Sequence, residues 1–96
     1  MNAMHEPIPI APLHVDIGGA GRYIGANNVE RMAALLISVE WPDKKLPAFH
    51  RALVTSLEAL DNSVSPERAR AAFVDAAHAA GMHIIPDDMT EIKKAS

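Results

Sequence analysis

Cysteine is absent from all 96 residues of the chain. The sequence therefore has no disulfide framework, no thiolate metal ligand and no cysteine nucleophile. A chain without cysteine fits a reducing compartment, and we expect a cytoplasmic protein.

Long apolar runs are also missing. The longest, Met32 to Ile37, is far shorter than the roughly 20 residues that a membrane-spanning helix requires. The first ten residues, MNAMHEPIPI, contain no basic segment and no continuous apolar segment, so we expect no secretion signal. We predict that the chain is not a membrane protein.

An excess of positive charge is lacking as well. Nine Lys and Arg residues stand against twelve Asp and Glu residues, which gives a net charge of −3. General binding to nucleic acid depends on neutralising phosphates with Lys and Arg. We therefore expect no nucleic-acid partner, and predict either an unidentified protein partner or self-association.

What the chain does contain is ordinary for one globular domain. Apolar residues make up 49% and charged residues 22% of the sequence. Pro7, Pro9 and Pro12 predict an extended, mobile lead-in over residues 1–12. We expect the globular domain at 13–86 and a polar tail at 87–96.

The clearest element is a helix between Ser65 and Gly81. Ser65 is a suitable N-cap, Pro66 suits the first helical position, and Gly81 is a typical stop signal. An alanine-rich apolar stripe surrounds Phe73, so we expect this helix to be the platform on which the other elements pack.

The remaining elements follow from periodicity and turn signals. Alternation from Leu13 to Ile17, a glycine-rich turn and a short return from Arg22 to Gly25 predict a β-hairpin. A helix is expected from Asn27 to Glu40, with Asn27 as cap and Glu30 reaching back to it. A further helix is expected over 47–60, with Leu57 on its buried stripe. After it we expect a turn in which Asn62 takes the left-handed conformation, and a last strand over 82–85. The predicted fold is α+β of order ββαααβ, a small antiparallel three-stranded sheet with three helices on one face.

A set of short motifs in the second half of the chain is similar to a known family. The motifs are Trp41-Pro42, Ala52-Leu53, Ser65-Pro66-Glu67, Ala69-Arg70, Ala72-Phe73, Ala76-Ala77 and Ala80-Gly81-Met82. With these the sequence resembles the bacterial domain of unknown function 982 over about residues 15–85. The resemblance implies a small cytoplasmic bacterial protein without an established activity. The chain departs from that pattern at Ser56, where many members carry cysteine, and at Asn62, where many carry glycine.

Two groups of residues invite a chemical interpretation that their spacing does not support. The turn glycines Gly18, Gly19 and Gly21 lack the third glycine of a dinucleotide fingerprint, and no Gly-Lys-Ser/Thr follows them. The five histidines include no pair at the spacing of a helical metal clip. We predict a plain hairpin turn, no metal, no cofactor and no catalytic residue, with His50 and His78 in solvent.

Other conspicuous side chains favour structural roles. Arg68, Arg70, Lys44 and Lys45 are interpreted as exposed residues rather than as an anion site, because Glu67 and Asp75 dilute their charge. Trp41, the single tryptophan, is expected to anchor the junction between two helices.

Strand alternation singles out one surface. It predicts that five residues share the sheet face opposite the helices, which we call the outer sheet face: His14, Asp16, Tyr23, His83 and Ile85. Tyr23 and Ile85 are more apolar than solvent favours, whereas the exposed helix positions are expected to be mostly charged. The leading hypothesis is a non-enzymatic interaction or regulatory module that uses this face. The alternative is a small-molecule binding or catalytic domain at the same face, where a His paired with an Asp can act as a base.

Overall fold

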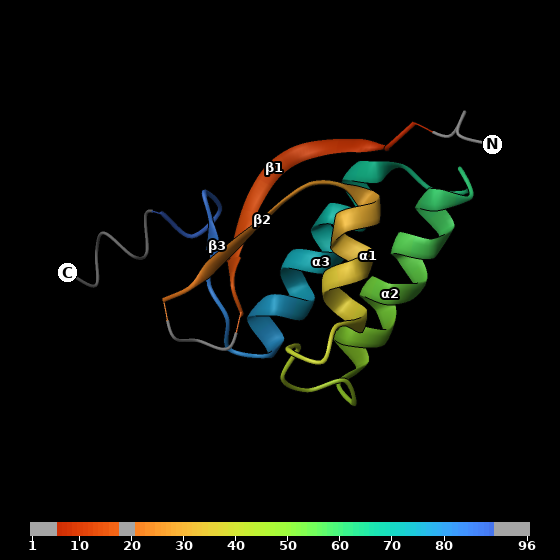
Figure 1. Ribbon diagram of the computed structural model, residues 1–96. Helices are drawn as coiled ribbons and strands as arrows, with labels where there is room; N and C mark the ends of the chain where they lie inside the picture. Colours follow the sequence, from red (N-terminus) through yellow and green to blue (C-terminus); the bar gives the residue numbers. More distant parts are fainter. Residues whose placement is uncertain (1–5, 18–20, 90–96) are drawn as a thin grey trace.

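The computed structural model describes residues 6–17 and 21–89, and within them it has three strands and three helices (Figure 1). In chain order these are β1 (Pro9–Asp16), β2 (Tyr23–Asn28), α1 (Val29–Ile37), α2 (Pro47–Leu60), α3 (Pro66–Ala79) and β3 (Ile84–Ile85). The predicted α+β fold of order ββαααβ is therefore confirmed.

The sheet is open and antiparallel, with β1 in the centre of the order β2-β1-β3. All three helices lie on one side of it (Figure 1). Leu13, Val15 and Ile17 alternate along the chain and are buried, as their period of two predicts. The central strand thus supplies one row of the core, and its other face turns away from the helices.

The helix α3 forms the platform expected from its sequence. Its small residues Ala69, Ala76 and Ala77 are buried around Phe73, which is fully buried. Trp41 packs its ring edge-on against Phe73, with 5.4 Å between ring centroids. Trp41 is buried, and its ring also lies 6.1 Å from that of Phe49 on α2, so it packs where α2 and α3 meet, in keeping with the expectation that it anchors a junction between two helices.

The predicted ends of α3 are also confirmed. The Ser65 side chain accepts a hydrogen bond from the Arg68 N–H at 3.2 Å, which caps the first turn. Gly81 has φ +80°, the left-handed conformation that an L side chain rarely adopts. The same conformation occurs at Asn62, with φ 63°, in the turn before α3.

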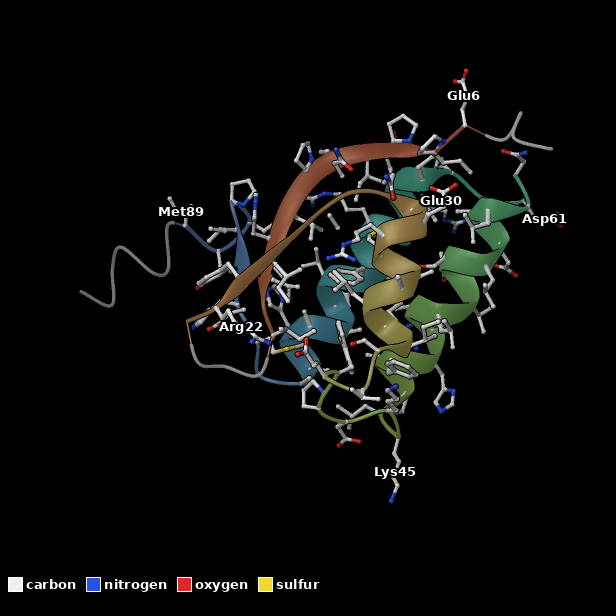
Figure 2. The ribbon with its side chains drawn as sticks, in the orientation of Figure 1. Glu6, Arg22, Glu30, Lys45, Asp61 and Met89 are labelled. Carbon is white, nitrogen blue, oxygen red and sulfur yellow. The ribbon has the colours of Figure 1, made fainter. Side chains whose placement is uncertain are left out.

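The helix α1 is shorter than expected at both ends. Its cap is Asn28 rather than Asn27, since the Asn28 side chain accepts the Arg31 N–H at 2.7 Å. Glu30 does not complete a capping box, because its carboxylate accepts the Ile8 N–H at 3.0 Å and holds the segment before β1 (Figure 2). The helix ends at Ile37, and the next residue, Ser38, has an extended backbone. The chain changes direction there, and Trp41 is buried in the core.

The helix α2 has the predicted bounds, but its buried stripe is displaced. Phe49 and Ala52 are buried as expected. Leu57 is 53% exposed, whereas Ser56, one position earlier, is fully buried. The prediction for Leu57 was wrong because helical periodicity fixes the spacing of a stripe but not the direction from which neighbouring helices cover it.

Ordered contacts are present on both sides of residues 13–86. The strand β1 begins at Pro9, inside the predicted lead-in, and Asp87 and Asp88 of the predicted tail contact α3. The predicted strand over 82–85 is reduced to its last two residues. Residues 1–5 of the lead-in, 18–20 of the hairpin turn and 90–96 of the tail lie outside the described residues.

Candidate functional site

The strand register places the five predicted residues in two neighbouring rows. His14 pairs with Gly25 on β2 and with Ile85 on β3, which makes the first row. In the second row, Asp16 pairs with Tyr23 and donates its backbone N–H to the His83 carbonyl at 3.0 Å. Because rows two residues apart along a strand share a face, all five belong to the outer sheet face.

These residues differ in how much of each side chain reaches solvent. His14 and His83 are exposed, and Tyr23 and Ile85 are half-buried. Asp16 is only 7% exposed, so the expectation that it would be presented to solvent was wrong. Its carboxylate accepts the Gly21 N–H at 2.8 Å and thereby stabilises the hairpin connection.

The ring of His14 lies against β2 where that strand has no side chain. A Cβ atom placed on Gly25 would lie 3.0 Å from the His14 Nε2 atom, closer than ordinary packing allows. Gly25 therefore permits this close approach. Beside it is an open hollow of about 320 Å³ that Pro12, His14 and Asn27 help to line.

A second group of polar residues adjoins the outer sheet face at His83. His78, at the end of α3, lies with its Nε2 atom 2.9 Å from both carboxylate oxygens of Asp88. The Nδ1 atom of His83 lies 3.9 Å from Asp88 Oδ2. These three side chains border an open depression of about 530 Å³. A carboxylate that orients a histidine in this way can support proton transfer.

The environment of Asp88 favours its charged form. Burial acts to raise the pKa of Asp88, but hydrogen bonds from the Ile84 N–H and from His78, together with the charge of His78 and His83, lower it below the ordinary value. The Ile84 N–H is 2.6 Å from Asp88 Oδ2, which fixes the carboxylate to the strand.

Sequence reasoning missed this group, since it placed His78 in solvent and Asp88 in a polar tail. A signal was present in Pro86-Asp87-Asp88, because these are typical turn residues directly after a strand. A turn there reverses the chain, and the Asp88 side chain then meets His78 at the end of α3.

Arg70 also has a role that its sequence position did not indicate. Its guanidinium forms a bidentate pair with Asp87, at 2.8 and 2.7 Å, and its Nε atom donates to the Ala11 carbonyl at 2.8 Å. The hydrogen bond with Asp87 raises the pKa of Arg70, and the same bond lowers the pKa of Asp87. The Arg70 side chain thus links α3 to β1 and to the turn after β3, and the interpretation that it is simply exposed was wrong.

Two further observations concern the described residues. None of their His, Asp or Glu side chains come together in a group of three that could hold a metal ion.

Over the same part of the chain, no helix combines the length and apolar character that crossing a bilayer requires.

The chain was compared with models of protein families. Residues 11–84 match the family model described as "Protein of unknown function (DUF982)". Neither curated proteins nor solved structures gave a significant match. Since the matched segment covers most of the chain, including β2, all three helices and most of β1, the chain belongs to this family of proteins of unknown function.

Proposed function

We propose that the protein is a non-enzymatic interaction module that binds a protein partner through the outer sheet face. The observation that carries this proposal is the pair of side-chain rows on the face that the helices leave uncovered (Figure 1). Tyr23 and Ile85 supply apolar surface, and His14 and His83 supply exposed polar groups around them. Such a mixture, with an aromatic residue as anchor, is typical of protein interfaces.

The shape of this face supports a macromolecular partner over a small ligand. Its hollow beside His14, of about 320 Å³, is open to solvent, whereas small-molecule sites enclose most of their ligand's surface. The two outer strands, β2 and β3, also offer strand edges to an extended segment of a partner.

The test is quantitative capture from a lysate of the native cell by the immobilised full chain. The Tyr23→Ser, Ile85→Ser double variant removes the apolar part of the outer sheet face. The Ile37→Ser, Val39→Ser variant is the matched control, because it makes the same kind of change at exposed apolar residues at and just after the end of α1, which belong to neither the outer sheet face nor α2. Circular dichroism first establishes that both variants are folded.

We expect one or more proteins whose captured amount falls at least about tenfold with the sheet variant and is unchanged with the control, since a lost aromatic anchor costs over 1.4 kcal/mol. If both variants capture the same proteins as the parent in the same amounts, the outer sheet face is not the binding surface.

A second candidate is favoured by the His78 and Asp88 pair. It is a small-molecule binding or acid–base function in the depression of about 530 Å³ that borders His83. Ligand-observed NMR with a library of small metabolites tests it, with Asp88→Asn as the comparison. Ligands that bind the parent and not the folded variant support this candidate, and an absence of ligands removes it.

We also propose a bacterial and cytoplasmic setting. The lack of cysteine and the resemblance to a bacterial family support it. Fractionation of native cells, followed by immunodetection of the chain, tests this proposal. Recovery in the membrane or extracellular fraction would contradict it.

A further inference from the structure

The helix α2 has an exposed stripe as regular as its buried one. Three exposed residues of α2 and the residue that caps its C-terminal end follow each other at spacings of four, three and four positions: His50, Val54, Leu57 and Asp61. With 3.6 residues per turn, they fall within a sector of about 60° on the helix surface. Val54 and Leu57 at its centre are each 53% exposed.

This pattern contradicts the expectation that exposed helix positions would be mostly charged. Alternate spacings of three and four residues are those of a seam along which two helices pack. The residues that face the domain's own core, Phe49, Ala52, Ser56 and Ala59, lie on the opposite side of α2. The exposed stripe therefore takes no part in packing the domain's own core.

The seam is complementary to itself when it is reversed. A two-fold axis that passes beside the exposed stripe, level with the midpoint between residues 55 and 56, brings Val54 of one copy against Leu57 of a second copy, and Leu57 against Val54. The same axis brings His50 at one end against Asp61 at the other. An interface between identical copies requires this self-complementarity.

The flanks of the seam agree with the same arrangement. Arg51 and Glu58 border it on one side, are exposed, and form no ion pair within the described residues. In an antiparallel pair of helices, Arg51 of one copy lies beside Glu58 of the other, on both sides of the axis. Leu53 and Leu60 border the opposite side and are half-buried, so they add apolar surface there.

We propose that α2 is a self-association surface, through which two copies of this chain pack their α2 helices antiparallel with Val54 against Leu57. This surface is separate from the outer sheet face, since α2 and β3 lie at opposite sides of the molecule (Figure 1). Asp61 and Lys45 mark the two ends of the helix in Figure 2. A helix of 14 residues is about 21 Å long, so the interface is small and the dimer is weak and reversible.

Sedimentation of the full chain from about 10 μM to about 1 mM covers the range of a weak association. The parent is expected to change from monomer to dimer over this series. Val54→Lys, Leu57→Lys places two like charges at the axis in each copy and should stay monomeric throughout. Ala34→Lys, Ala79→Lys adds the same charge at exposed positions of α1 and α3 and should dimerise as the parent does.

A charge exchange tests the antiparallel register. Arg51→Glu places like charges together twice per dimer and should weaken association at least about threefold. Adding Glu58→Arg to it restores opposite charges across the interface and should recover the parent's affinity. Circular dichroism and unfolding midpoints establish that each variant is folded.

A parent that remains monomeric at the highest concentration would overturn the proposal. So would a Val54→Lys, Leu57→Lys variant that dimerises like the parent, or an Arg51→Glu variant with unchanged affinity. The Tyr23→Ser, Ile85→Ser variant must dimerise normally, because loss of its dimer would place self-association on the sheet. Partner capture by the outer sheet face is measured separately, so either result can fail without the other.

Discussion

Arg70 and Asp87 form two parallel hydrogen bonds, of 2.8 and 2.7 Å, between the middle of α3 and the turn that follows β3. The same guanidinium donates to the Ala11 carbonyl on β1. One side chain therefore joins the platform helix to the central strand and to the last segment of the domain. His83, which belongs to the outer sheet face, lies in the segment of the chain between Arg70 and Asp87, the two residues that these hydrogen bonds join.

Removal of this connection should destabilise the domain measurably. We expect Arg70→Ala to lower the free energy of unfolding by about 2 kcal/mol, since hydrogen bonds between charged groups are lost and Asp87 loses its partner. Arg68→Ala is the matched control, because Arg68 is exposed and its side chain has no partner among the described residues. It should cost under about 0.5 kcal/mol in the same urea titration. Equal losses for the two variants would contradict the role of Arg70.

Acid should weaken the fold through two carboxylates. The pKa values of Asp87 and Asp88 are lowered from 3.8 in the folded chain, so the folded state binds fewer protons than the unfolded state near that pH. Their contribution to stability is complete above the unfolded value and is lost as the pH falls through the folded values. Urea titrations between pH 7 and pH 2.5 should show the decline below about pH 4. Asp87→Asn should be less stable at pH 7 and decline less in acid, and a decline as large as the parent's would contradict this account.

Phe73 should be the most sensitive position of the core. It is fully buried on an alanine face and contacts the Trp41 ring. Phe73→Ala leaves a cavity, and we expect a loss of about 3 to 5 kcal/mol in the free energy of unfolding. Phe73→Leu fills most of that cavity and should cost less than half as much. A loss under about 1 kcal/mol for Phe73→Ala would show that α3 is not the platform.

Ser56 should be a position where a substitution stabilises the chain. It is fully buried in α2, and its hydroxyl oxygen has no hydrogen-bond partner in the part of the chain that the structure describes. Ser56→Ala removes an unsatisfied polar group and improves helix propensity, so the free energy of unfolding should rise by about 0.5 to 1.5 kcal/mol. Thermal unfolding measures the change. A loss of stability would mean that the hydroxyl has a partner in solution.

The elements with both a start and a stop signal were predictable from the sequence. In α3, Ser65 and Gly81 act locally, through their own hydrogen bonds and backbone angles, so their neighbours in the sequence suffice to identify them. The alternation of β1 was equally informative, because a period of two fixes which side chains share a face. The outer sheet face followed from that alternation and from the fold order.

What depends on contacts distant in sequence was not predictable. Glu30 bonds Ile8 and not its own helix cap, and Arg70 bonds a residue 17 positions away. Asp16 has the parity of an exposed residue but is buried, and although Gly21 is only five positions away, the hydrogen bond from its N–H to the Asp16 carboxylate depends on how the hairpin folds. In each case a polar group satisfies a backbone or charged partner that only the folded chain brings near. The His78 and Asp88 pair belongs to the same class.

Site-specific photo-crosslinking in the native cell tests the proposed function most directly. A photoreactive amino acid replaces Tyr23 on the outer sheet face, and in a separate strain it replaces Glu67, which is exposed on α3. We expect one defined protein to be crosslinked from position 23 and the same protein not to be crosslinked from position 67. The same crosslink from both positions, or a crosslink from position 67 alone, would contradict binding through the outer sheet face.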